Sequence, residues 1–279
     1  MTHDELLYNS LSHYFHVDLL VPPEGAISSY RLDDPELLRS VIARQPADMA
    51  DLGQPRVSGI MTAKLYGTIA VAAIFAATLF DRLLPVDRRS VYLLPGGEHG
   101  FRFVIPPGDV AKAAGLPVDR AARQEALRRH LERLFEGHIA PVWDLLAENS
   151  AADHRSMWSL LSTNTATMFL RGRQEPYRSS LRIRPELQRR MDADESLVFA
   201  HGPEGPFPGR DRNPLVQPTR LFTPPEGAGP PIYLRTKCCL RYRLRVAGEA
   251  VPYCSTCPKV SEHERLRLMQ SAHETRDRQ

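Results

Sequence analysis

The sequence predicts an α+β protein with a mainly helical body, short antiparallel hairpins and a small cysteine-rich module near its C-terminal end. Three observations support this prediction. Several stretches in the first 200 residues carry apolar side chains at helical spacing. Two short apolar runs flank a glycine-rich turn, as in a β-hairpin. All four cysteines of the 279-residue chain lie between positions 238 and 257.

Length and composition restrict the class of protein. A chain of 279 residues with 42% hydrophobic and 25% charged residues can bury a sizeable core. The net charge is only +3, so we expect no nucleic-acid partner. The first residues, "MTHDELLYNS", contain no apolar run of the kind that a secretory signal needs. We therefore expect a cytoplasmic protein, whose thiols stay reduced.

The helices are predicted from capping residues and periodicity. The segment His3 to Phe15 has the pattern of a short helix. A second helix begins near Asp34, which can cap it, and Pro35 suits its first position, while Pro46 ends it. Further helices are predicted at residues 58–84, 120–136, 138–148 and 155–171, with a short one near 186–191 and another within the last twenty residues.

One apolar stretch raises the question of a membrane. The 16 residues from Leu65 to Phe80 carry no charge. A spanning helix needs about 20 apolar residues, so the run is short for a span. We interpret it as a buried core helix, and peripheral association with the inner face of a membrane remains open.

Strands are predicted at fewer places. The runs Val91–Leu94 and Phe101–Ile105 flank "PGGEHG" and predict a hairpin. The segments "SSLRIRP" and "ESLVFAH" are predicted as short strands. Between Leu240 and Val246, apolar residues alternate with arginines, which predicts a strand with one apolar and one basic face.

The composition divides the chain into three parts. We predict a helical body over residues 1–200 and a cysteine-bearing module over residues 232–279. Glycine and proline supply nearly half of the positions from 201 to 231, so this part is either a linker or a loop on the surface.

Cys238, Cys239, Cys254 and Cys257 predict a four-thiolate site. A redox dithiol at Cys254 and Cys257 would leave the adjacent pair without a role. Zinc sites usually combine two C-x₂₋₄-C knuckles, whereas here the first pair is vicinal. A two-iron cluster places two thiolates on each iron and so tolerates diverging sulfur directions. The spacing leaves zinc and iron–sulfur open and favours iron–sulfur.

The segment "RTKCCLRYRLRVAGEAVPYCSTCP" resembles the C-terminal signature of FhuF-like ferric siderophore reductases. That signature is a vicinal cysteine pair, a gap and then Cys-x-x-Cys, often followed by proline. The helical body and the "WSLLSTN" stretch are similar to that family as well. The resemblance implies that Cys238, Cys239, Cys254 and Cys257 hold a 2Fe–2S cluster.

The same resemblance implies the activity. The protein would be an oxidoreductase that passes one electron to siderophore-bound Fe(III) and releases Fe(II) in the cytosol for iron acquisition. The alternative is a zinc-stabilised, non-enzymatic protein that binds siderophores or assists assembly. No flavin or nicotinamide fingerprint is evident, so we expect electrons to come from a separate protein such as a ferredoxin or a flavin reductase.

Two sets of residues are candidates for docking. Arg241, Arg243 and Arg245 are either the solvated face of an edge strand or a surface for an acidic donor or an anionic iron chelate. Trp158, Asn164 and Arg171 lie on the predicted helix 155–171 and are candidates to line a chelate pocket. Alternatively, Asn164 is a core amide that ties down backbone.

Overall fold

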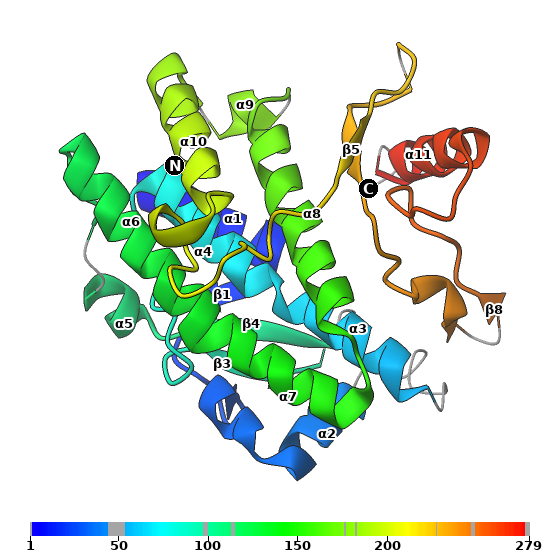
Figure 1. The fold of residues 1–279 in the computed structure, drawn as a ribbon, viewed down its shortest axis with the longest axis horizontal. Helices are drawn as coiled ribbons and strands as arrows, with labels where there is room; N and C mark the ends of the chain where they lie inside the picture. The colour runs from blue at the N-terminus through cyan, green and yellow to red at the C-terminus, as the bar shows by residue number, and fades with distance from the viewer. Residues whose placement is uncertain are drawn as a thin grey trace.

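The computed structural model describes residues 2–43, 54–96, 100–112, 115–175, 177–181, 183–226, 228–246 and 249–276, and its fold is α+β and mainly helical, as predicted (Figure 1). The main helices are α1 (His3–Phe15), α2 (Pro35–Ala43), α3 (Pro55–Tyr66), α4 (Thr68–Phe80), α6 (Arg120–Leu134), α7 (Ala140–Ser150), α8 (His154–Gly172), α10 (Pro185–Val198) and α11 (Glu262–Arg276). Shorter helical elements are η1 (Ser29–Asp33), α5 (Pro107–Lys112), the π-helical turn η3 (Phe135–Ile139), α9 (Tyr177–Ser180), η4 (Gly202–Glu204) and η5 (Arg241–Arg243).

A small mixed sheet lies in the lower half of Figure 1, above α2. Its order is β1-β4-β3-β2, from β1 (Val17–Leu19), β2 (Ile27–Ser28), β3 (Tyr92–Pro95) and β4 (Phe101–Ile105). The hairpin of β3 and β4 is antiparallel, as the sequence predicts. The sequence does not predict β1, which runs parallel to β4, or β2. Strands of two or three residues are too short to show a period of two.

The uncharged stretch forms the central helix of the body. Every residue of α4 from Ile69 to Phe80 is buried. Helices α1, α6, α8 and α10 all pack against α4. The continuous run Pro55–Phe80 is long and apolar enough to span a membrane, but 83% of its most apolar window is buried within the protein. The interpretation as a core helix therefore agrees with the packing.

Two of the predicted strands are wrong. In "SSLRIRP", the two serines end α9 and the proline begins α10, and the first four residues of "ESLVFAH" end α10. Pro185 occupies the first turn of α10, where its missing N–H costs nothing. Met191, Asp194 and Val198 are buried along one side of α10 at helical spacing. The carboxylate of Asp194 accepts hydrogen bonds from both terminal nitrogens of Arg123, at 2.5 and 2.9 Å, which fixes α10 to α6.

The segment rich in glycine and proline lies on the helical body. Phe207 is buried and stacks on Phe135 with ring centroids 5.2 Å apart, while the ring of Trp158 is 5.4 Å away. Farther along, β5 (Arg220–Phe222) pairs with β6 (Ile232–Leu234), across the boundary predicted at residue 231. The segment therefore contacts the body at one end and the cysteine-bearing part at the other.

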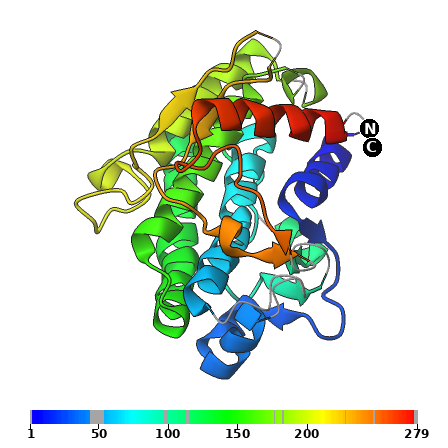
Figure 2. The same ribbon diagram turned by 90° about the vertical axis from the view of Figure 1, so that its right-hand side faces the viewer.

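The C-terminal segment covers one side of the helical body, and Figure 2 shows it in orange and red in front of the green and cyan helices. Strand β6 packs against α8, and η5 packs against α3. Cys239, Leu244 and Val251 belong to the same buried hydrophobic cluster as the body. The cysteine-bearing part therefore shares its core with the rest of the chain.

The close contact between α3 and the end of α7 gives a test of how the helical body is packed. A Cβ on Gly59 would overlap the side chain of Ser150, 2.6 Å from its Cβ, and would lie 3.1 Å from the Cβ of Ala152. Overpacking of this kind costs about 1–3 kcal/mol. We expect Gly59→Ala to lower the free energy of unfolding by this amount in urea titrations. Gly137→Ala is the control, because open space surrounds Gly137, and it should be neutral or stabilising.

Candidate metal centre

The four cysteines lie together, two on each arm of the C-terminal segment. The Sγ atoms of Cys238 and Cys257 are 3.6 Å apart. The thiol of Cys239 interacts with those of Cys238 and Cys254. All four are free cysteines, with Cys239 and Cys257 buried and the other two half-buried. The predicted clustering of the four thiols is therefore found in the structure.

A reversal of the backbone lets the two adjacent cysteines face the same centre. Leu240 has a left-handed conformation with φ of 61°, and its N–H donates to Sγ of Cys238 at 3.4 Å. The chain then forms the 3₁₀ turn η5 before β7 (Arg245–Val246) pairs with β8 (Glu249–Ala250). Of the strand predicted from Leu240 to Val246, the structure has only the end, as β7, because the chain turns at Leu240.

The second arm forms a tight turn against the first. The N–H of Cys257 donates to the carbonyl of Cys254 at 2.9 Å, which closes the turn. The N–H of Arg235 donates to the carbonyl of Thr256 at 3.1 Å. This bond joins the arm that carries Cys238 and Cys239 to the arm that carries Cys254 and Cys257.

Arg265 fixes the turn from behind. Its side chain projects from α11 and is only 2% exposed. The guanidinium donates to the carbonyls of Ser255, Cys257 (3.1 Å) and Val260 (3.0 Å), and it lies over the ring of Phe222 at 5.5 Å. Burial lowers the pKa of Arg265, which still lies far above neutral for an arginine. The sequence does not predict this role, because Arg265 lies in a polar helix with other arginines.

Two cations lie beside the Cys239–Cys254 pair. Arg235 is 9% exposed, and its Nη1 donates to Sγ of Cys254 at 3.6 Å. Lys64 projects from α3, and burial lowers its pKa, as does the neighbouring charge of Arg235. Its charge also interacts with Cys239 and Cys254. The sequence places Arg235 among the basic residues near the cysteines but gives no signal for Lys64.

The contacts among the thiols shift their pKa values in opposite directions. The hydrogen bond from Cys238 lowers the pKa of Cys239, and the bond with Cys254 lowers it further. The same contact raises the pKa of Cys238. The hydrogen bond with Cys239 and then burial raise the pKa of Cys254. Negative charge therefore concentrates at Cys239, near Arg235 and Lys64.

Four cysteine thiols are a donor set that zinc sites and iron–sulfur clusters both use. Two thiolates on one tetrahedral metal at about 2.3 Å lie about 3.8 Å apart, close to the 3.6 Å between the Cys238 and Cys257 sulfurs. In the described part of the chain, no group of three or more His, Cys, Asp or Glu side chains is placed to hold a metal ion.

The three arginines of the predicted basic face do not share one face. Arg241 and Arg243 lie in η5, where Arg241 is half-buried and Arg243 is exposed. Arg243 donates to Oε1 of Gln54 at 3.3 Å. The backbone of Arg245 pairs in β7, but its side chain lies outside the described part of the structure.

An exposed aromatic and cationic surface lies close to Cys254 in the sequence. The rings of Tyr242 and Tyr253 stack with centroids 4.7 Å apart. Nζ of Lys259 is 4.8 Å from the centroid of Tyr242 and donates to its hydroxyl at 3.0 Å. Arg243 donates to the same hydroxyl at 3.4 Å. We call Tyr242, Arg243, Tyr253 and Lys259 the tyrosine–lysine surface.

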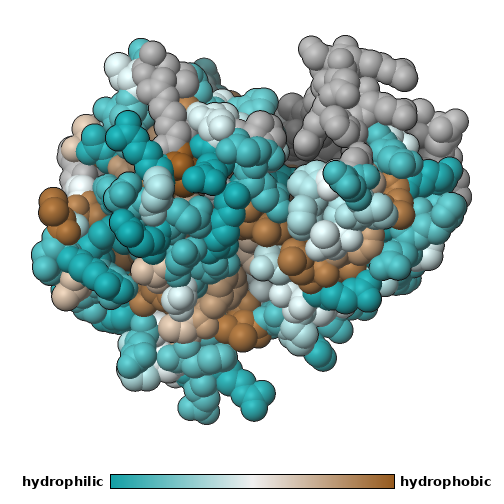
Figure 3. Space-filling model, turned by 90° about the horizontal axis from the view of Figure 1, so that it is seen from above, coloured by the Kyte–Doolittle hydropathy of each residue, from teal (hydrophilic) through white to brown (hydrophobic). Residues whose placement is uncertain are grey.

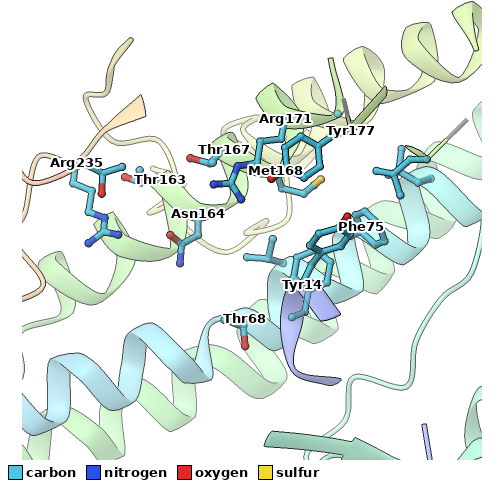
Figure 4. Close-up of a pocket in the computed structure, with 16 residues that line it drawn as sticks. Tyr14, Thr68, Phe75, Thr163, Asn164, Thr167, Met168, Arg171, Tyr177 and Arg235 are labelled. Carbon is cyan, nitrogen blue, oxygen red and sulfur yellow. The ribbon is translucent and has the colours of Figure 1, made fainter. Parts of the chain in front are cut away.

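A cavity of about 270 Å³ lies along α8 (Figure 4). Arg235 and Thr256 line its end at the cysteines, and Asn164 and Arg171 line its wall on α8. In Figure 4, Asn164 lies between the two arginines, and Tyr14, Thr68 and Phe75 lie on the opposite side. Seen from above, hydrophobic side chains reach the surface between the helical body and the C-terminal segment (Figure 3).

The structure separates the three candidate residues on α8. Asn164 and Arg171 line the cavity. Trp158 does not line it, and its predicted docking role is wrong, because its ring packs edge-on against Trp143 at 4.3 Å within the aromatic core. The helical side that carries Trp158 faces α7 and Phe207 instead of α1. Tyr14 and Tyr177, which the sequence did not single out, complete the cavity wall.

Comparison with known proteins adds no identification. No family model matches the chain, and no curated protein matches it.

The hydrogen bonds of Arg265 give a test of how the turn is held. Bonds to a charged donor contribute about 1.5–3 kcal/mol each before the cost of burial, so we expect Arg265→Met to lower the free energy of unfolding by about 2–4 kcal/mol. The same variant should retain less metal after purification. Both effects follow from release of the carbonyls of Ser255, Cys257 and Val260.

The control lies on the same helix. Arg267 is exposed, and among the described residues its side chain pairs with Glu264, three residues away. Arg267→Met should change stability by less than about 0.5 kcal/mol and leave metal content unchanged. Equal urea midpoints for the two variants would contradict the role of Arg265.

Proposed function

We propose that this protein binds a 2Fe–2S cluster and reduces ferric siderophores in the cytosol, as the resemblance to FhuF-like reductases implies. The observation that carries the proposal is the meeting of four free thiols at the end of a cavity lined by cations. An oxidoreductase of this kind requires a redox centre near the surface and a place to hold the iron chelate beside it.

Each iron would take one ligand from either arm of the segment. Cys238 and Cys257 would hold one iron, and Cys239 and Cys254 would hold the other. When bound, such a cluster supplies electrons one at a time at a potential that nearby charge adjusts. The N–H of Leu240 and the guanidinium of Arg235 donate to the sulfurs of Cys238 and Cys254. Donors of this type stabilise negative charge on sulfur.

The substrate would be Fe(III) in a siderophore. Hard oxygen ligands favour Fe(III) over Fe(II), so one-electron reduction weakens the complex and lets other ligands capture Fe(II). No nucleophile or proton-transfer pair is needed for this reaction. The chain's part is to bind and orient the chelate next to Cys254, through the cavity residues Asn164, Arg171 and Arg235.

Electrons would come from a separate protein. The tyrosine–lysine surface is cationic and lies in the same segment as the cysteines. An acidic donor such as a ferredoxin would dock on it by charge complementarity, and the encounter would slow as salt increases. A flavin reductase is the alternative donor.

Metal analysis tests the cluster. We expect protein purified without oxygen to contain iron and acid-labile sulfide in equal amounts and to absorb visible light. Cys239→Ser should lose most of the iron, because it removes a buried ligand. Ser255→Ala, between the two ligands of the second arm, should keep it. Stoichiometric zinc without iron would contradict the proposal and favour the zinc-stabilised binding protein.

Turnover tests the reaction. The reduced protein, mixed with a ferric siderophore, should release Fe(II) to a ferrous-specific coloured chelator under anaerobic conditions. The Cys239→Ser variant provides the blank. If protein that contains the cluster releases Fe(II) no faster than the Cys239→Ser variant, the reductase activity is contradicted.

Arg235 should raise the reduction potential of the centre. Its Nη1 donates to Sγ of Cys254 from a buried position, so removal of its charge destabilises the reduced state. We expect Arg235→Gln to lower the midpoint potential by on the order of 60 mV, which is a tenfold change for one electron. Arg243→Gln is the control and should shift it less, because Arg243 is exposed and bound to Gln54. Potentiometric titration in the visible range measures both.

A further inference from the structure

We propose that the cavity beside the cysteines selects anionic ferric chelates with aromatic arms, of the catecholate type, over neutral hydroxamate chelates. This inference rests on the proposed function and specifies its substrate class. It is carried by the charges and rings that line the cavity.

The charged side chains in the cavity wall are all cations. Arg171 and Arg235 line it, and no aspartate, glutamate or lysine is among the described residues that do so. The remaining polar groups are neutral, from Asn164 and the hydroxyls of threonines and tyrosines. A half-enclosed site with two guanidiniums and no carboxylate attracts an anion.

Arg171 is available to a ligand. Its guanidinium lies 5.6 Å from the ring centroid of Tyr177, which is a cation–π contact. Across the described residues, no ion pair involves Arg171, although many surface arginines of this protein are paired with carboxylates. Arg171 is exposed, so a chelate can reach it from solvent.

Arg235 supplies the second charge at the other end. It is 9% exposed, and its Nε has no hydrogen-bond partner in the described structure. A buried guanidinium with a free donor requires an acceptor. Its Nη1 already donates to Cys254, so a ligand that satisfied Nε would lie next to the metal centre.

The rings define the shape of the ligand. Tyr14 and Tyr177 lie with centroids 6.0 Å apart at the end near Arg171, and Phe75 lines the floor between α1 and α4. Aromatic walls favour a flat, aromatic arm. A volume of about 270 Å³ is just below the range of roughly 300–1,000 Å³ of small-molecule sites. The cavity is therefore of a size to hold one arm of a chelate.

Gallium(III) chelates test the selection without redox chemistry, because gallium(III) is not reduced under these conditions. Calorimetric titration of the full-length, cluster-bearing protein compares gallium(III) tris-catecholate, which is anionic, with a neutral gallium(III) tris-hydroxamate. We expect the catecholate to bind at least tenfold more tightly. Arg171→Gln should weaken catecholate binding about tenfold, which corresponds to about 1.4 kcal/mol, and leave hydroxamate binding unchanged.

Two variants control for charge and for folding. Arg171→Lys keeps the charge and should restore most of the affinity for the catecholate. Arg178→Gln removes one positive charge from an exposed residue outside the cavity and should leave affinity unchanged. Equal affinity for the two chelates, tighter binding of the hydroxamate, no binding of either, or equal losses in Arg171→Gln and Arg178→Gln would each overturn the proposal.

The outcome is separable from that of the proposed function. If the protein releases Fe(II) from hydroxamate chelates and does not bind catecholates, the reductase function stands and the proposed selectivity is contradicted. Protein that contains no iron but binds the catecholate through Arg171 would retain the selectivity and lose the reductase function.

Discussion

The whole candidate site depends on one constraint, which is that two arms of the C-terminal segment must bring four sulfurs together. The left-handed turn at Leu240 directs both adjacent thiols toward the second arm. The backbone bond from Arg235 to Thr256 then sets the register between the arms. Arg265 holds the outer turn through three carbonyls. Each of these contacts involves a backbone atom of the two arms, so the backbone of the arms sets the sulfur positions.

The position of Arg235 connects this constraint to the cavity. Its backbone joins the two arms, its guanidinium donates to Cys254, and its side chain lines the cavity. A ligand charge in the cavity and a charge on the sulfurs would therefore compete for the same cation. If the proposed cluster and chelate were both bound, the negative charge of the chelate would offset the charge of Arg235 and would lower the reduction potential of the centre.

The sequence predicts the fold class and the long helices of this protein better than its short strands and turns. The fold class, the hairpin of β3 and β4 and the long helices follow from periodicity and capping, because each is strong over many residues. The clustering of the thiols follows from the concentration of cysteines in one segment. The strand predicted after Cys239 fails because the alternation of arginines with apolar residues is outweighed by one turn at Leu240. The roles of Lys64 and Arg265 leave no local pattern, since they depend on packing between segments distant in sequence.

The cavity is completed at one end by the C-terminal segment, through Arg235 and Thr256. Its walls come from Tyr14 on α1, Thr68 on α4, Asn164 on α8 and Thr256 between the cysteines. Ser159 on α8 shares a hydrogen bond of 2.9 Å with Thr236, and Gln174 donates to the carbonyl of Pro231 at 3.3 Å. These bonds hold the segment against α8 on both sides of β6. Because any ligand that joins the two arms stabilises the docked segment, occupancy of the metal centre and formation of the cavity are thermodynamically linked, and each favours the other.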